Sequence, residues 1–239
     1  MINLDKIRKQ VVPWKLDKYE ELGKWKDLEH PHQATIPKDS LLLQKLHIEQ
    51  GDEVLAIAGF WADWALALQK QGAIVDYSDI SSDLVAHFKN SFRRAFVANY
   101  IDIPDKTKYD WTFSFEPCGG SCGLIIALLR SLLNRKGAVI VIFPRQKQGK
   151  PIGSKEMRFP KLFSAVADTY GCMWKMKDVG IEATRGSGKD VQSPHRVFWL
   201  YTNQKSRKTA EDDLKRLENP NDRISNLAKL VEPEFRRPD

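Results

Sequence analysis

A glycine and an acid twenty positions apart are the first residues in this sequence with the spacing of a chemical site. Gly59 follows the apolar run VLAIA, and Asp79 ends a second run, AIVDYSD. In folds that bind nucleotide cofactors, such a turn lets the backbone approach the ligand, and the later acid accepts hydrogen bonds from both ribose hydroxyls. The pair predicts a site for a ribose-containing cofactor. The alternatives are a tight strand-to-helix turn at Gly59 and a helix N-cap at Asp79.

A second group of reactive side chains lies in FEPCGGSCG, residues 115–123, directly after another apolar run. The carboxylate of Glu116 can accept hydrogen bonds from an amine and orient it. The thiolate of Cys118 is a suitable nucleophile for a polarised ring carbon if its pKa is lowered. We therefore treat Glu116 and Cys118 as candidate catalytic residues. The simpler alternative is that Cys118 and Cys122 are two small thiols beside a glycine-rich turn, and without further ligands they predict no metal site.

Positive charge is concentrated in RQKQGKPIGSKEMRFPK, residues 145–161. This segment has a net charge of +5, whereas the whole chain has a net charge of +7. It is either a solvated loop or a patch that attracts phosphates, such as those of RNA or another anionic partner. The candidate phosphate-binding residues are Arg145, Lys147, Lys150, Lys155 and Arg158.

These candidates require elements that bring them to one edge of a sheet. Short apolar runs predict strands at 53–59, 73–79, 109–115 and 138–143, and VANYIDIP, residues 97–104, predicts a short third strand that ends near Asn99. Helical patterns occupy 62–72, 82–96, 123–137 and 160–171. Two more strand-like segments follow, separated by RGSGKD, which we interpret as a hairpin turn. Strands that alternate with helices in this way predict an α/β fold with a mainly parallel sheet and an antiparallel edge.

The chain of 239 residues suits one α/β domain with additions at both ends. We expect a helical extension at 1–50, the α/β domain at 51–204, and a charged, partly helical tail at 205–239. No apolar run approaches the roughly 20 residues of a membrane span, and the charged start lacks the apolar core of a signal peptide. Three cysteines form no disulfide framework. We therefore expect a cytoplasmic protein without membrane association, whose oligomeric state is left open.

The order and spacing of these segments resemble the class I S-adenosylmethionine-dependent methyltransferases over roughly residues 50–203. VLAIAGFWAD and QGAIVDYSDISSDLV are similar to the family's glycine loop and ribose-binding acid, and VANYIDIPDKTKYDWTFSF to its third and fourth strands. LLNRKGAVIVIFP is similar to its fifth strand with the preceding turn. The resemblance implies a Rossmann-like fold with a mainly parallel seven-stranded sheet, an antiparallel edge strand and helices on both faces. It implies S-adenosyl-L-methionine as cofactor, bound by Ala58, Gly59, Phe60, Asp79, Ile80, Asn99 and Tyr100.

The first loop departs from the family pattern, which runs acid-x-Gly-x-Gly-x-Gly. The corresponding positions hold Ala56, Ala58, Phe60 and Ala62. Glycine is needed where the backbone approaches the ligand or adopts a positive φ, and we expect alanine to replace it only where φ is negative. The missing acid at Ala56 removes an anchor for the amino group of the cofactor, and Asp63 is a candidate replacement.

Two functions remain open. The first is an S-adenosylmethionine-dependent methyltransferase that acts on RNA or another anionic molecule, with Glu116 orienting the acceptor. The loop EPCGG of this chain is also similar to a loop of cytosine-C5 RNA methyltransferases, although the cysteine expected on the next loop is missing. The second is a catalytically inactive binding or assembly protein that keeps the fold, as the altered glycine loop suggests. A nicotinamide enzyme ranks last because the sequence contains no G-x-G-x-x-G.

Overall fold

The computed structural model describes residues 41–57, 62–79, 82–97, 109–115, 128, 130–142, 154–185 and 189–215. The strands are β1 (Glu53–Ile57), β2 (Ile74–Asp79), β3 (Arg94–Val97), β4 (Trp111–Phe115), β5 (Gly137–Ile142), β6 (Met173–Arg185) and β7 (Lys189–Tyr201). The helices are α3 (Leu41–Lys45), α4 (Asp63–Lys70), α5 (Ser82–Phe88), α7 (Ser154–Tyr170) and α8 (Gln204–Lys215). None of the described helices is long and apolar enough to cross a membrane.

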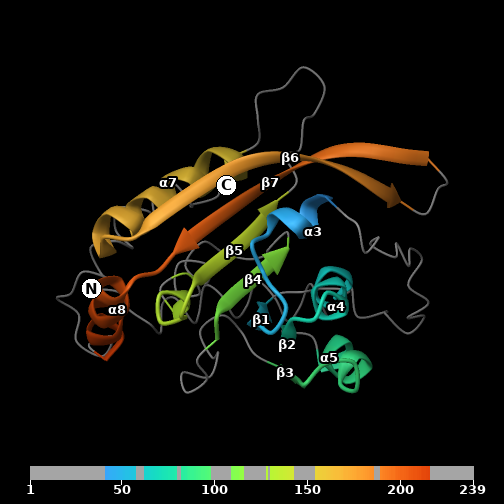
Figure 1. Cartoon of the computed structure of the whole chain (residues 1–239), viewed down its shortest axis with the longest axis horizontal. Helices are drawn as coiled ribbons and strands as arrows, with labels where there is room; N and C mark the ends of the chain where they lie inside the picture. Colours follow the sequence, from blue (N-terminus) through green and yellow to red (C-terminus); the bar gives the residue numbers. More distant parts are fainter. Residues whose placement is uncertain are drawn as a thin grey trace, which may run out of the picture.

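One sheet of seven strands organises the molecule, in the order β3-β2-β1-β4-β5-β7-β6. The pairs from β3 to β5 are all parallel, whereas β7 is antiparallel to both β5 and β6. β7 therefore opposes the other strands, and it lies beside the edge strand β6 (Figure 1). The predicted fold class, a mainly parallel seven-stranded sheet with an antiparallel strand at one end and helices on both faces, is confirmed.

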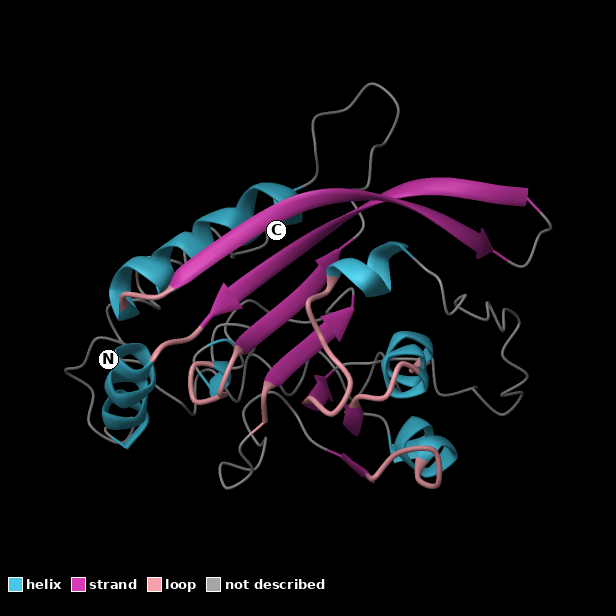
Figure 2. Cartoon of the chain, viewed as in Figure 1, coloured by secondary structure: helices cyan, strands magenta, loops and turns pink. Residues whose placement is uncertain are grey.

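An apolar core covers each face of the sheet, because strands buried on both sides supply apolar side chains in both directions. On β5, Val139 and Val141 belong to a core shared with α3, α4 and α5. The alternate residues Ile140 and Ile142 belong to a second core, shared with α7 and α8. In Figure 2, α7 runs alongside the long β6–β7 hairpin, and α4 and α5 lie beside β1 and β2. The two cores hold the strands in register and so fix where each strand ends.

The third strand begins earlier than the sequence predicted. The helix expected at 82–96 ends at Phe88, and Arg94 already belongs to β3. No glycine or proline marks this boundary in the sequence. Instead, Arg93 and Arg94 form hydrogen bonds with the buried carboxylate of Asp76 on β2, and these long-range contacts draw the segment into the sheet. Tertiary interactions here override the local helical pattern.

The helix expected at 160–171 is longer than predicted. α7 begins at Ser154, so Pro160 lies inside it, and Gly171 follows its end with a φ of 63°. Proline removes one intrahelical hydrogen bond, but Phe163 and Val166 are fully buried and hold the helix against the sheet. The end of the basic segment, expected to be a strand-end loop, is therefore helical.

The last two strands form the predicted hairpin. β6 and β7 pair from Met173↔Tyr201 to Arg185↔Lys189, so the turn falls within RGSGKD as expected. After β7, α8 starts with a reciprocal cap: the Ser206 N–H donates to Asn203 Oδ1 at 2.8 Å, and the Asn203 N–H donates to Ser206 Oγ at 2.9 Å. The cap fixes where the chain leaves the sheet and directs the helix onto the second core.

Candidate functional site

The carboxyl ends of β1, β2 and β4 meet at one edge of the sheet. In open α/β sheets, ligands bind at this edge, near the point where the strand order reverses. Here the chain passes outward from β1 to β2 and β3, and then crosses to β4 on the other side of β1. The reversal therefore lies between β1 and β4, next to the end of β2.

Asp79 is the last residue of β2, and its backbone pairs with Val97 of β3. The residue is only 7% exposed. Two positions earlier, Tyr77 is fully buried, and burial together with the negative charge of Asp79 raises the pKa of its hydroxyl. A carboxylate at the rim of an apolar core makes stronger hydrogen bonds than one in water. Asp79 thus lies at the edge where a ribose-binding acid is needed, and its role in binding stays a prediction.

The residue before α4 has a backbone conformation that favours glycine, although it is an alanine. Ala62, the N-cap of α4, has a φ of 59° and a ψ of 7°, in the left-handed region. The expectation that alanine stands only where φ is negative is therefore wrong at this position. The left-handed conformation costs alanine about 1 kcal/mol. Ala62 is 1% exposed, so burial of its methyl group against the core compensates for part of this cost.

An aromatic pair joins the start of α4 to the end of β4. The rings of Trp64 and Phe115 stack with their centroids 5.0 Å apart and an interplanar angle of 26°. Both side chains pack against the first core while remaining partly exposed. The pair forms an apolar wall at the carboxyl edge, immediately before Glu116 in the chain.

The other predicted site residues lie outside the described residues. These are Ala58, Gly59, Phe60, Ile80, Asn99, Tyr100, Glu116, Cys118, Arg145, Lys147 and Lys150. The backbone of Lys155 and Arg158 belongs to α7, whereas their side chains are outside the description. The roles assigned to all of these residues stay predictions. Asp63, the candidate replacement for the missing acid, opens α4 as its first residue.

The described residues include neither a reactive thiol nor a cluster of metal ligands. Burial raises the pKa of the Cys172 thiol to about 11, so this thiol stays protonated and unreactive at neutral pH. Within the described ranges, no group of three or more histidine, cysteine, aspartate or glutamate side chains is placed to hold a metal ion. Neither a thiolate nor a metal centre is therefore found among these residues.

Ion pairs gather towards the opposite, amino-terminal edge of the sheet, where sequence reasoning predicted nothing. Arg93 bridges Glu53 and Asp76, and Arg135 bridges Glu53 and Asp110. Hydrogen bonds from the two arginines lower the pKa of Glu53, and the hydrogen bonds from Arg135 lower that of Asp110. Shifted carboxyls of this kind often mark functional sites. These are held in ion pairs away from the edge where ligands bind, so we assign them a structural role.

Comparisons with known proteins agree with the architecture. No family model and no curated relative matches the chain. Among solved structures, the chain is similar to 1,6-didemethyltoxoflavin-N1-methyltransferase from Burkholderia thailandensis, with 1,6-didemethyltoxoflavin and S-adenosylhomocysteine bound. The identity is 14% and the TM-score 0.52, over 78% of this chain and 86% of the other.

Two further structures have the same general likeness. A dimethyladenosine transferase from Plasmodium falciparum is 16% identical over 79% of this chain and 71% of its own, with a TM-score of 0.49. A SAM-dependent methyltransferase from Aquifex aeolicus is 16% identical over 74% of this chain and 97% of its own, with a TM-score of 0.48. The strand order and the Burkholderia structure establish a likeness of fold. This chain has the Rossmann-like fold of the class I S-adenosylmethionine-dependent methyltransferases.

Proposed function

We propose that this protein binds S-adenosylmethionine at the carboxyl edge of the sheet and transfers its methyl group to an anionic acceptor, of which RNA is the first candidate. The observation that carries the proposal is the position of Asp79, a buried carboxylate at the end of β2 beside the reversal of strand order. A ribose-binding acid needs this position. The Burkholderia structure with the same fold contains S-adenosylhomocysteine, which supports this choice of ligand.

The residues of this chain would act mainly by positioning. The bound cofactor supplies a methyl group on a sulfonium, which needs no further activation. Asp79 would accept hydrogen bonds from the ribose hydroxyls. The stacked rings of Trp64 and Phe115 would exclude water from one side of the site. Glu116, the next residue after Phe115, would accept hydrogen bonds from an acceptor amine and align its lone pair with the methyl group.

The basic segment at 145–161 would hold the anionic part of the acceptor. It follows β5, and the carboxyl end of β5 lies at the same edge of the sheet as those of β4 and β1. Phosphates drawn to this segment would approach the methyl group from the β4–β5 side. Because the segment attracts anions at long range, we expect it to affect the rate of association as well as the affinity.

A binding protein without turnover is the second candidate, and one feature of β1 favours it. Ala56 stands where the family pattern has an acid, and it is 1% exposed inside the first core. Its methyl group packs and cannot hold the amino group of a cofactor. A chain with this change could keep the fold and lose the affinity for S-adenosylmethionine.

Titration calorimetry with S-adenosylmethionine and S-adenosylhomocysteine separates these candidates. We expect the full chain to bind both ligands. Asp79→Asn keeps the shape of the side chain and removes its charge, which weakens hydrogen bonds worth roughly 1.5–3 kcal/mol, so Kd should rise about 10- to 100-fold. Asp212→Asn, an exposed acid on α8, is the matched control and should leave Kd unchanged. If the wild type gives no binding heat at millimolar ligand, the methyltransferase is excluded and the binding protein without turnover remains.

A further inference from the structure

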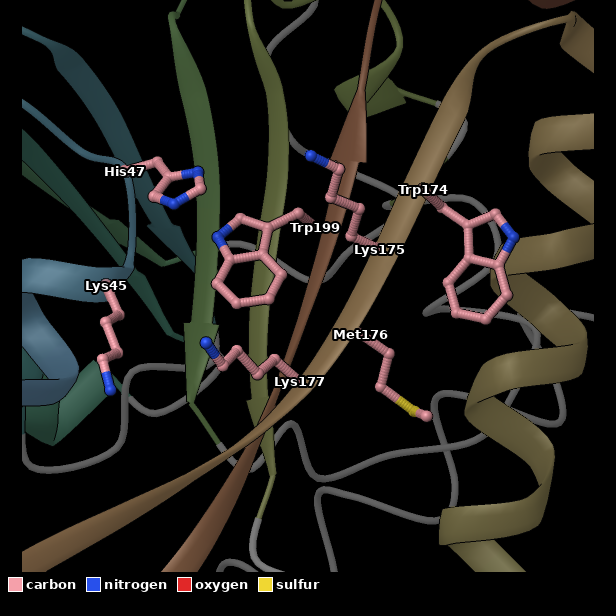
Figure 3. A pocket seen from close by; sticks show the side chains of 7 residues that line it. All are labelled: Lys45, His47, Trp174, Lys175, Met176, Lys177 and Trp199. Carbon is pink, nitrogen blue, oxygen red and sulfur yellow. The ribbon is translucent and has the colours of Figure 1, made fainter.

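A groove lies beside the β6–β7 hairpin, where the end of α3 meets β6. Its volume is about 610 Å³, and it is lined by the end of α3, by β6 and by β7 (Figure 3). We call it the lysine groove and define it by Lys45, His47, Lys175, Lys177 and Trp199. Trp174 and Met176, which alternate with the lysines on β6, complete its lining. In sequence these residues are far apart, and the sheet topology brings them together.

Three ammonium groups surround this groove. Figure 3 shows Lys175 and Lys177 pointing from β6 to the side of Trp199 and His47, with Lys45 opposite them. All three lysines are exposed. Among the described residues that line the groove none is acidic, and none of the three lysines forms an ion pair with a described residue. Among the described residues no carboxylate therefore neutralises these ammonium groups, and that of Lys175 lies 5.6 Å from the centroid of the Tyr201 ring.

His47 gives the groove a flat aromatic face. Its ring stacks on Trp199 with a centroid distance of 5.3 Å and an interplanar angle of 24°, and its Nδ1 lies 2.9 Å from the hydroxyl of Tyr201. Trp199 is itself fixed, because its Nε1–H donates to the carbonyl of Leu46 at 3.1 Å. One ring face of His47 packs on Trp199, and the residue is exposed, so a ligand can reach the imidazole.

The backbone at His47 is strained in a way that favours a role for this ring. Its φ is 59°, in the left-handed region, which costs a residue other than glycine about 1 kcal/mol. Histidine tolerates the region better than most residues. The strain turns the chain after α3 so that the imidazole lies over Trp199 beside the lysines. Strained residues of this kind are concentrated at binding and active sites.

The lysine groove is separate from the site proposed for the cofactor. Trp199 pairs with Val139 and with Lys175, and Tyr201 pairs with Gly137, the first residue of β5. In register, the groove runs from the level of Val139, opposite Trp199 and Lys175, to the level of Val141, opposite Val197 and Lys177, near the carboxyl end of β5. Asp79 ends β2, near the other end of the strand order. Because β1, β4 and β5 lie between β2 and β7, a ligand in the groove would not occupy the position of Asp79.

We propose that the lysine groove docks single-stranded RNA. Lys45, Lys175 and Lys177 would neutralise successive phosphates, and the exposed imidazole of His47 would stack on a base. Lysines around an aromatic platform are the arrangement that binds single strands without sequence readout. An acidic peptide would match the charge but leave the aromatic face unused. The role of this RNA as methyl acceptor rests on the proposed function, whereas the docking itself does not.

Fluorescence anisotropy with a labelled single-stranded RNA oligonucleotide tests this proposal on the full chain. The variant Lys175→Gln/Lys177→Gln removes two charges from the groove. We expect at least about tenfold weaker binding at low salt and a salt-dependence slope shallower by about 1.4, since each phosphate contact on a single strand contributes about 0.7. Lys205→Gln/Lys208→Gln removes two exposed charges from α8 and is the charge-matched control. It should change Kd less than twofold.

Three results would overturn the proposal: no RNA binding by the wild type, equal weakening by the two double variants, or equally tight binding of an acidic peptide of the same charge. His47→Asn tests the stacking, because asparagine tolerates the same backbone conformation. It should weaken binding of the oligonucleotide but not of an abasic strand of the same length, and equal weakening of both would count against stacking. S-adenosylmethionine calorimetry on the same proteins keeps the two proposals apart. RNA binding without cofactor binding contradicts only the methyltransferase, and cofactor binding without RNA binding contradicts only the groove.

Discussion

Replacing Asp76 with asparagine should destabilise the fold more than any conservative change on the surface. The Asp76 side chain is completely buried, and it accepts hydrogen bonds from three side chains. Arg93 donates from Nε at 2.8 Å and from a second guanidinium nitrogen at 3.0 Å. Arg94 donates from Nε at 2.9 Å, and the Tyr109 hydroxyl donates at 2.8 Å. One carboxylate thus joins β2 to the start of β3 and to Tyr109, two residues before β4.

The size of the effect follows from what Asp76→Asn leaves behind. Its Nδ2 would face N–H donors, so a buried amide would lose its partner at a cost of about 1–3 kcal/mol. Breaking a buried ion pair costs about 3–5 kcal/mol when a charge stays buried. The side chains of Arg93 and Arg94 are 37% and 50% exposed and can return to water, which reduces this cost. We therefore expect a loss of about 3 kcal/mol.

Urea unfolding, followed by tryptophan fluorescence, measures this loss. With a slope of about 3 kcal/mol per molar urea, 3 kcal/mol lowers the midpoint by about 1 M. Asp178→Asn is the control, because Asp178 also pairs with an arginine, Arg196, at 2.5 and 2.8 Å, but its side chain is 54% exposed. An exposed pair contributes about 0–1 kcal/mol. Similar losses in the two variants would refute the reasoning.

The pH dependence provides an independent check. Burial alone raises the pKa of Asp76, but the hydrogen bonds from Arg93, Arg94 and Tyr109 outweigh it, so the pKa is lowered. A lowered pKa in the folded state means that the stabilisation is present above the ordinary pKa of about 4. It is lost as the pH falls through the lower folded value. The difference in unfolding free energy between wild type and Asp76→Asn should therefore shrink below about pH 4, and a constant difference down to pH 3 would contradict this account.

Two backbone positions give further predictions, each with its own control. Gly137→Ala should cost more than about 3 kcal/mol in urea unfolding, because the added Cβ would lie 1.8 Å from the Leu200 carbonyl oxygen at a φ of 143°. Gly171→Ala, at a φ of 63° with nothing within 4 Å of the added Cβ, should cost only about 1 kcal/mol, and equal losses would count against the clash. Ala62→Gly should stay within about 0.5 kcal/mol of the wild type, since relief of the left-handed strain offsets the lost methyl burial. Ala67→Gly, in the buried interior of α4, should cost about 2 kcal/mol, and a smaller loss than that of Ala62→Gly would refute the conformational argument.

Most of the sheet could be predicted because its strands are buried on both faces. β1, β4 and β5 appear in the sequence as short apolar runs, and in the structure nearly all their residues are buried. The turns after α4 and α7 were also predictable, since Gly72 and Gly171 both have positive φ. Local chemistry alone dictates these features, so a single sequence is sufficient to identify them.

Features that depend on distant partners could not be predicted. The end of α5 is stabilised by the ion pairs of Arg93 and Arg94 with a buried acid on β2, and within 82–96 only Asn90 and Ser91 favour a turn there. The lysine groove has the same origin, because Lys45 and Lys175 become neighbours only when α3 packs against β6. Of the candidate site, the sequence could place Asp79 because strand length decides where β2 ends. The Trp64–Phe115 pair joins two elements distant in sequence and needed the structure.

The altered glycine loop is weaker evidence against cofactor binding than its sequence suggests. A sequence motif describes residue types, whereas a ligand binds to backbone groups and carboxylates in a particular spatial arrangement. Ala62 adopts the left-handed conformation although it is not a glycine, and Asp79 supplies an acid at the end of β2. The one loss that conformation cannot repair is the acid at Ala56, whose position is filled by a buried methyl group. For the proposed function we therefore expect weaker binding of the cofactor's amino group than of its ribose, and we expect binding to depend most on Asp79.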